Sequence, residues 1–131
     1  MSEEPKPSPG QIVWHDLTIP NAEEVRDFYA RVVGWTHQAL SMGEYDDYLM
    51  NMPDSGETAA GVCHTRGPNA KIPPQWLVYF AVSNVDESIR SCQAMGGEVV
   101  DGPRKMGDQF FCVVRDPAGA VCALIGPGSG G

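Results

Sequence analysis

The order of apolar and polar residues predicts the same strand–helix unit twice, 63 positions apart. Residues 11–19 and 75–82 read as strands, and each is followed by a segment with helical spacing. The first helix carries an apolar stripe at i, i+3, i+4 and i+7 that is expected to face a sheet: Val25, Phe28, Tyr29 and Val32. The second helix, over 84–95, is expected to turn four residues inward: Val85, Ile89, Cys92 and Met95.

Capping residues repeat with the same shift. An Asn precedes each helix as a preferred N-cap, and a Glu stands three positions later, where a capping box can form: Asn21 with Glu24, and Asn84 with Glu87. Gly34 and Gly97 stand where the helices should end and are expected to adopt the left-handed conformation. Repetition of cap, stripe and terminal glycine indicates an internal structural repeat.

Shorter strand candidates complete each half. They cover residues 36–41, 45–52 and 58–65, then 98–100, 109–114 and 120–125. The prediction is an α+β fold of paired βαβββ modules that form a curved mixed sheet with the helices on its outer face. A single domain is expected over residues 11–126, with module one at 11–65, module two at 75–126, and flexible tails at 1–10 and 127–131.

Composition narrows the class of partner. The chain has 131 residues and a net charge of −8, which argues against nucleic acid and against an anionic membrane surface. No N-terminal run resembles a signal peptide, and no apolar stretch is long enough to span a bilayer. The four cysteines lack metal-type CxxC spacing, so a cytoplasmic protein with reduced thiols is expected.

Several short motifs make the chain resemble the vicinal oxygen chelate superfamily, which includes glyoxalase I, extradiol dioxygenases and bleomycin-resistance proteins. The motifs lie at residues 13–18 (VWHDLT), 28–29 (FY), 33–35 (VGW), 94–97 (AMGG) and 116–119 (DPAG). The resemblance extends over residues 11–126 and implies the paired βαβββ fold. It does not imply one reaction, because the superfamily hosts several chemistries and some plain binding proteins.

The resemblance also implies where metal ligands would stand. Metal-dependent members bind a divalent ion through His and Glu side chains, but Trp14, Leu77 and Ala123 occupy three of those positions here. His64 is the one candidate on the strand before the linker. His15 lies beside a ligand position and is expected to face the helix as a packed, hydrogen-bonded core histidine. Neither a metal nor another cofactor is therefore expected.

Strand alternation suggests a different use for the concave faces. If Trp14 faces the cavity, strand alternation places Asp16 and Thr18 on the same face. By the internal repeat, the equivalent strands of the second half contribute further residues to the pocket. The expected ligand pocket consists of Trp14, Asp16, Thr18, Leu77, Tyr79, Phe111 and Ala123. These positions hold Asp16 but no Lys or Arg, so flat neutral or cationic aromatic ligands are expected to bind better than anions. The same aromatic residues could equally fill an interface between modules or between subunits.

The leading hypothesis is a glyoxalase/bleomycin-resistance-like protein with a metal-independent small-molecule pocket between its concave faces. The alternative is a lyase, isomerase or dioxygenase of this superfamily with a non-standard or relocated divalent metal site, in which Asp16 could act as a base. A third option is a structural or regulatory dimer with filled cavities. Long sheet edges and exposed apolar surface favour a homodimer. The sequence leaves open whether the chain is an enzyme.

Overall fold

The computed structural model describes residues 7–129 and divides the chain into two compact units. One unit is His15–Leu77, here called the α1 unit after its helix α1 (Ala22–Val32). The other combines Met1–Trp14 with Val78–Gly131 and is called the α2 unit after its helix α2 (Val85–Ala94). The chain passes between the units within strand β1 (Ile12–Ile19) and again within strand β5 (Trp76–Ala81).

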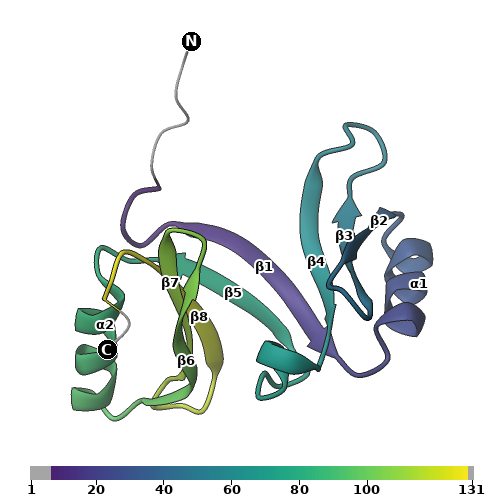
Figure 1. Cartoon of the computed structure of the whole chain (residues 1–131). Coiled ribbons are helices and arrows are strands. Elements are labelled where there is room, and N and C mark those ends of the chain that lie inside the picture. The colour runs from purple at the N-terminus through teal and green to yellow at the C-terminus, as the bar shows by residue number, and fades with distance from the viewer. Residues whose placement is uncertain (1–6, 130–131) are drawn as a thin grey trace. The chain divides into compact units, whose positions relative to one another are not determined.

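The α1 unit is a four-stranded mixed sheet with one helix. It contains β2 (Thr36–Ser41), β3 (Asp46–Asn51) and β4 (Thr58–His64), in the hydrogen-bonded order β2-β3-β4-β1. β1 runs parallel to β4, whereas the other neighbouring strands are antiparallel. A short 3-10 turn, η1 (Gly67–Asn69), follows β4. Figure 1 shows α1 beside the β2–β3–β4 sheet, and β2 lies at the free edge of that sheet.

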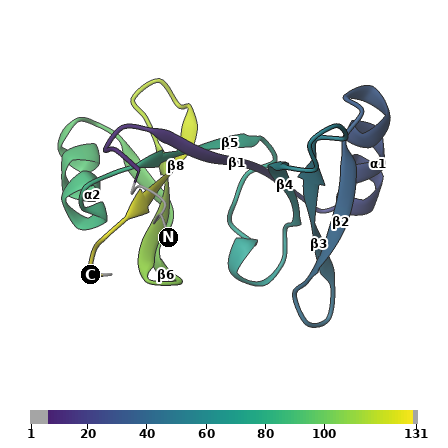
Figure 2. The same ribbon diagram turned by 90° about the horizontal axis from the view of Figure 1, so that it is seen from above.

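The α2 unit repeats this arrangement. Its strands are β5, β6 (Glu98–Met106), β7 (Gln109–Arg115) and β8 (Val121–Gly126), in the order β5-β8-β7-β6. β5 runs parallel to β8, and the remaining pairs are antiparallel. Figure 2 shows the two helix-bearing units from a second direction. The α+β class and the repeated βαβββ order are therefore confirmed.

The apolar stripe of α1 is only half buried. Ala22 is fully buried, and Val25 and Tyr29 pack against the core of the α1 unit. Phe28 and Val32 are 55% and 64% exposed, so the prediction that they face the sheet is wrong. Ala22, Val25 and Tyr29 form one line along the helix, and this line rather than the Phe28 side faces the sheet.

The prediction of which α2 residues point inward is confirmed except at the last of them. Val85 is fully buried, and Ile89 and Cys92 pack against the same cluster as Cys112 of β7. Met95 is 76% exposed, because α2 ends at Ala94 and the chain has left the helical path.

The predicted caps are correct at only some positions. Asn84 accepts a hydrogen bond from the Glu87 N–H at 2.9 Å, as predicted for an N-cap. Asn21 makes no such bond, and its side-chain amide donates to Glu24 at 3.2 Å instead.

The two terminal glycines play different parts. Gly34 has the left-handed φ of 90° expected after α1. After α2, the residue with the left-handed conformation is Gly96 (φ 91°) and not Gly97. A Cβ at Gly97 would lie 2.6 Å from the Cys92 sulfur, so the glycine is required there by close packing.

Hydrogen bonds hold the described parts of both tails, for which the sequence predicts flexibility. The Gly10 N–H donates to the Ala81 carbonyl at 2.7 Å, and the Val85 N–H donates to the Pro127 carbonyl at 2.7 Å. Ser129 donates to Asp86 through its N–H and its hydroxyl, and these bonds lower the pKa of Asp86. The rest of the predicted tails, residues 1–6 and 130–131, lies outside the described residues. Between residues 7 and 129, no helix is long and apolar enough to cross a membrane.

Candidate functional site

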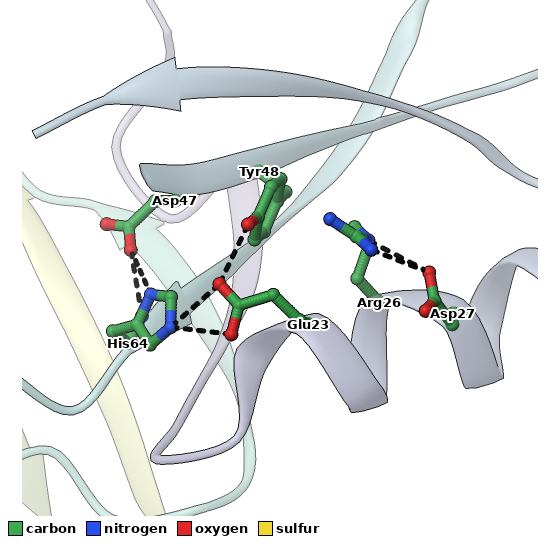
Figure 3. A network of polar contacts seen from close by, with 6 residues as sticks. All are labelled: Glu23, Arg26, Asp27, Asp47, Tyr48 and His64. Carbon is green, nitrogen blue, oxygen red and sulfur yellow. Dashed lines mark hydrogen bonds and ion pairs between the residues drawn. The ribbon is translucent and has the colours of Figure 1, made fainter. Parts of the chain in front are cut away.

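A buried histidine in the α1 unit lies between two carboxylates (Figure 3). The Nδ1 atom of His64 is 3.4 Å from Asp47 Oδ1, and its Nε2 atom is 3.1 Å from Glu23 Oε2. Asp47 also accepts the His64 N–H at 2.8 Å. The side chains of His64 and Asp47 are 9% and 5% exposed, whereas Glu23 is half exposed. The histidine is thereby held on both sides of its ring.

Local structure explains this arrangement. Glu23 lies in the first turn of α1, where a carboxylate interacts favourably with the helix dipole. Tyr48 of β3 is buried under the helix, and its hydroxyl donates to Glu23 Oε2 at 2.8 Å. This bond is the main cause that lowers the pKa of Glu23. The pKa of Tyr48 is raised, mainly by burial and to a smaller extent by the hydrogen bond to Glu23.

These contacts do not fit a metal site. Both ring nitrogens of His64 already lie within contact distance of a carboxylate, so neither nitrogen faces open space in which a metal ion could sit. Burial raises the pKa of the neighbouring Cys63 thiol far above neutral pH. Within residues 7–129, no group of three His, Cys, Asp or Glu side chains has the geometry to hold a metal ion.

In the α2 unit, the sheet face opposite α2 carries an aromatic stack. The Tyr79 and Phe111 rings stack with centroids 5.4 Å apart and an interplanar angle of 23°. Ala123 is the register partner of Tyr79 on the neighbouring strand. Phe110 packs instead against the cluster beneath α2, so Phe111 faces away from the helix, as alternation predicts. Tyr79, Phe111 and Ala123 are each at most 5% exposed, and this places them beneath the surface.

Arg104 is a residue that the sequence analysis missed. Its guanidinium lies 4.9 Å from the centre of the Phe111 ring and 3.1 Å from Asp101. Arg104 pairs in register with Phe111, because β6 extends to Met106. The sequence predicts this strand only over 98–100. Arg104, whose guanidinium covers the Phe111 ring, lies in the part of β6 that this prediction left out. None of the seven predicted pocket positions holds an Arg or Lys, but Arg104 lies beside one of them, Phe111.

The α2 unit also has a cavity of about 720 Å³ at one end of this sheet face. Its floor includes Ala81 and Ile125, which are register partners, and Ile125 in turn faces Phe111. The lining residues are Pro7, Pro9, Val13, Trp14, Ala81, Val82, Ser83, Asp108, Gln109, Ile125, Gly126 and Pro127. Asp108 is the one charged side chain among these described residues. A smaller cavity of about 450 Å³ opens beside α2 and contains none of the predicted pocket residues.

The predicted pocket residues fall into both units. Trp14 lines the larger cavity, and Tyr79, Phe111 and Ala123 lie on the sheet face that continues from its floor. The other three belong to the α1 unit: Asp16, Thr18 and Leu77. Their part in ligand binding remains a prediction.

His15 is more exposed than the sequence analysis predicts. The side chain is exposed, so the expectation of a packed core histidine is wrong. Burial in β1 begins only at Leu17, and alternation assigns His15 to a face of the strand without stating how deeply that face is covered.

Comparison with known proteins agrees with the fold. CFP32 of Mycobacterium bovis, which carries a glyoxylase name, is 29% identical over 119 residues, covering 90% of this chain and 44% of CFP32. DnrV of Streptomyces peucetius, an anthracycline biosynthesis protein, is 31% identical over 129 residues, covering 89% of this chain and 47% of DnrV. The chain thus spans less than half the length of these curated relatives.

Solved structures show the same fold at low sequence identity. A methylmalonyl-CoA epimerase variant from Streptomyces coelicolor matches with a TM-score of 0.53 and 15% identity, covering 92% of this chain and 99% of that chain. A Legionella pneumophila structure described as an NAD-dependent benzaldehyde dehydrogenase matches with a TM-score of 0.55 and 17% identity, covering 87% and 97%. Residues 11–124 match the family described as the Glyoxalase/Bleomycin resistance protein/Dioxygenase superfamily. The chain therefore belongs to this superfamily.

Proposed function

We propose that this protein binds a small, flat organic molecule, neutral or cationic, in the cavity of the α2 unit and without a resident metal ion. The observation that carries the proposal is the make-up of the cavity wall, which combines Trp14 with apolar residues and a single carboxylate, Asp108. The proposed site lies within one unit and replaces Asp16 by Asp108 as the acidic partner of the ligand.

Size and chemistry of the wall support this class of ligand. A volume of about 720 Å³ lies in the range of small-molecule sites, which are mostly apolar with a few polar groups. The Trp14 indole and the prolines offer flat surfaces for an aromatic ring. Asp108 is exposed and would attract a cation, whereas an anion would find no basic side chain among the described lining residues.

The floor of the cavity is held in place by packing on the same sheet face. Ile125 faces Phe111 across the β7–β8 pair, and Phe111 stacks on Tyr79. Arg104 is engaged by the Phe111 ring and by Asp101, so its charge is already partly matched. A floor fixed by packing loses little freedom when a ligand binds, which favours affinity.

Metal independence is supported by the donor groups available. Trp14, Leu77 and Ala123 stand where the family resemblance implies ligands, and His64 is engaged at both nitrogens. The four cysteines are free thiols, in keeping with a location in the reducing cytoplasm. The relatives named for anthracycline biosynthesis support flat aromatic molecules as the first ligands to test.

The test compares two aromatic probes of opposite charge. Binding of 9-aminoacridine, a cation, and of anthraquinone-2-sulfonate, an anion, is followed by fluorescence after dialysis against a chelator. We expect the cation to bind more tightly. Trp14→Leu and Asp108→Asn should each weaken it roughly twofold to fivefold, the range expected for one cation–π contact or one exposed charge pair.

Matched controls are Phe28→Leu and Asp54→Asn, which change an exposed aromatic residue and a turn carboxylate in the α1 unit. Neither should alter binding. Preferred binding of the anion would contradict the proposed ligand class. Binding or turnover that appears only with an added divalent metal would favour the alternative, an enzyme with a relocated metal site.

A further inference from the structure

The two edge strands of the molecule differ sharply in how they are protected. The β6 edge carries Pro103, charged residues of both signs, and register irregularities against β7. Such features prevent a strand from pairing with another chain. β2 (THQALS) has none of them: it contains no charge and no proline, all six residues are exposed, and its register with β3 is unbroken. β2 is therefore an open template for another strand.

The hydrogen bonds of the β2–β3 pair show which backbone groups point outward. Met42, one residue beyond β2, donates its N–H to the Tyr45 carbonyl at 2.8 Å, and this pair continues the β2–β3 register. Hydrogen-bonded and non-hydrogen-bonded positions alternate along an antiparallel pair. Residues 36, 38 and 40 therefore bond to β3, whereas His37, Ala39 and Ser41 direct their N–H and C=O groups away from the sheet.

The three outward-facing residues are self-complementary. A twofold axis at Ala39, perpendicular to the sheet, sets Ala39 opposite its copy and His37 opposite Ser41. Every outward N–H and C=O then has a partner, which gives about six hydrogen bonds across two strands. A register shifted by two positions would pair only His37 with Ala39, and about four bonds would form.

Charge and apolar exposure favour a second copy as the occupant. Two chains with a net charge of −8 repel each other, and a six-residue edge without charge is a segment where they can approach closely. Leu40 and Met42 are 46% and 42% exposed at this edge. In the twofold arrangement, Leu40 lies opposite Gln38 of the other copy and loses much of that exposure.

We infer that β2 pairs, antiparallel and in this register, with β2 of a second copy of the chain, so that two α1-unit sheets join into one. Such an isologous interface closes on itself and leaves neither β2 edge open. The interface is independent of the ligand proposed for the α2 unit.

Oxidative cross-linking tests the register. Cα atoms of a directly opposed, hydrogen-bonded pair lie about 5.5 Å apart, within reach of a disulfide. Ala39→Cys should therefore form a covalent dimer under mild oxidation. Gln38→Cys carries the same native cysteines and lies one residue away, but it should cross-link at least fivefold less. Stronger cross-linking at position 38 than at position 39 would overturn the proposed register.

Sedimentation velocity tests the interface itself. The wild-type chain should sediment at twice its mass of 14.1 kDa at micromolar concentration. Leu40→Lys sets a charge at the edge and should shift the protein to monomer. Met106→Lys is the matched control, a residue of similar exposure (44%) on the other edge strand, and should remain dimeric. Circular dichroism confirms that each variant is folded. A monomeric wild type, or a dimer that Leu40→Lys leaves intact, would refute the inference.

Discussion

Replacing Phe111 with leucine tests the packing beside the proposed ligand cavity. The ring is 1% exposed, stacks on Tyr79 with centroids 5.4 Å apart, and lies under the Arg104 guanidinium at 4.9 Å. Leucine keeps most of the apolar volume and removes the aromatic ring. The substitution therefore measures the stack and the cation–π contact more directly than truncation to alanine would.

The expected cost follows from these contacts. A close aromatic pair contributes about 0.5–1.5 kcal/mol beyond its buried area, and a partly buried cation–π contact about 0.5–1 kcal/mol. Phe111→Leu should therefore lower the free energy of unfolding by about 1–2.5 kcal/mol. Phe111→Ala also leaves a cavity and should cost about 3–5 kcal/mol. Since small domains are stable by about 5–15 kcal/mol, the leucine variant should remain folded and measurable.

Urea unfolding gives the value, provided that the slope of the transition is the same in both proteins. Phe28→Leu is the control, because its ring is 55% exposed, and it should change stability by less than about 0.5 kcal/mol. A double-mutant cycle with Arg104→Met should return a coupling of about 0.5–1 kcal/mol. If Phe111→Leu costs no more than Phe28→Leu, the stack described for this sheet face is absent in solution.

Three further predictions concern other parts of the chain. The Tyr48 hydroxyl lowers the pKa of Glu23 below its ordinary 4.5, so its stabilising effect is present at neutral pH and lost as the pH falls through the folded-state pKa. The difference in urea midpoint between wild type and Tyr48→Phe should therefore narrow on acidification, and an unchanged difference would contradict this bond. A Cβ at Gly126 would lie 2.2 Å from a main-chain carbonyl oxygen, whereas one at Gly128 would meet ordinary contacts, so the Gly126→Ala variant should melt several degrees below Gly128→Ala. Burial raises the pKa of the Cys112 thiol to about 12, so iodoacetamide at pH 7.5 should label it, by mass spectrometry, only in urea; rapid labelling of the folded protein would show that this core opens.

The sequence predicts the backbone better than the site. The repeat, the hydrophobic periodicity and the turn residues place both helices and most strand ends within about two residues of their observed positions, because each signal acts over a few neighbouring residues. β6 is the exception. Its continuation past residue 100 includes Gly102 and Pro103, which sequence rules read as an end of a strand. Arg104 lies in that continuation, so its contact with Phe111 could not be anticipated.

Strand alternation predicts the face of a side chain but not its depth. Phe111 does face away from α2, yet it is buried beneath Arg104. The open surface lies instead where strands end and turns begin, near Trp14 and Asp108. A residue such as Asp108, in the two-residue turn between β6 and β7, carries no periodic signal. Its place beside the cavity depends on segments distant in sequence, and only the folded chain brings these together.

The internal repeat also clarifies what His64 does. Glu23 in the first turn of α1 corresponds, after the shift of 63 residues, to Asp86 in the first turn of α2. Glu23 binds His64 at the end of β4, and Asp86 binds Ser129 just beyond the end of β8. In both units an acidic residue at the start of the helix holds the segment that leaves the last strand. The shared geometry, with different partners, indicates that the contact joins helix to sheet, and that His64 serves the fold of its unit through Glu23 and Asp47.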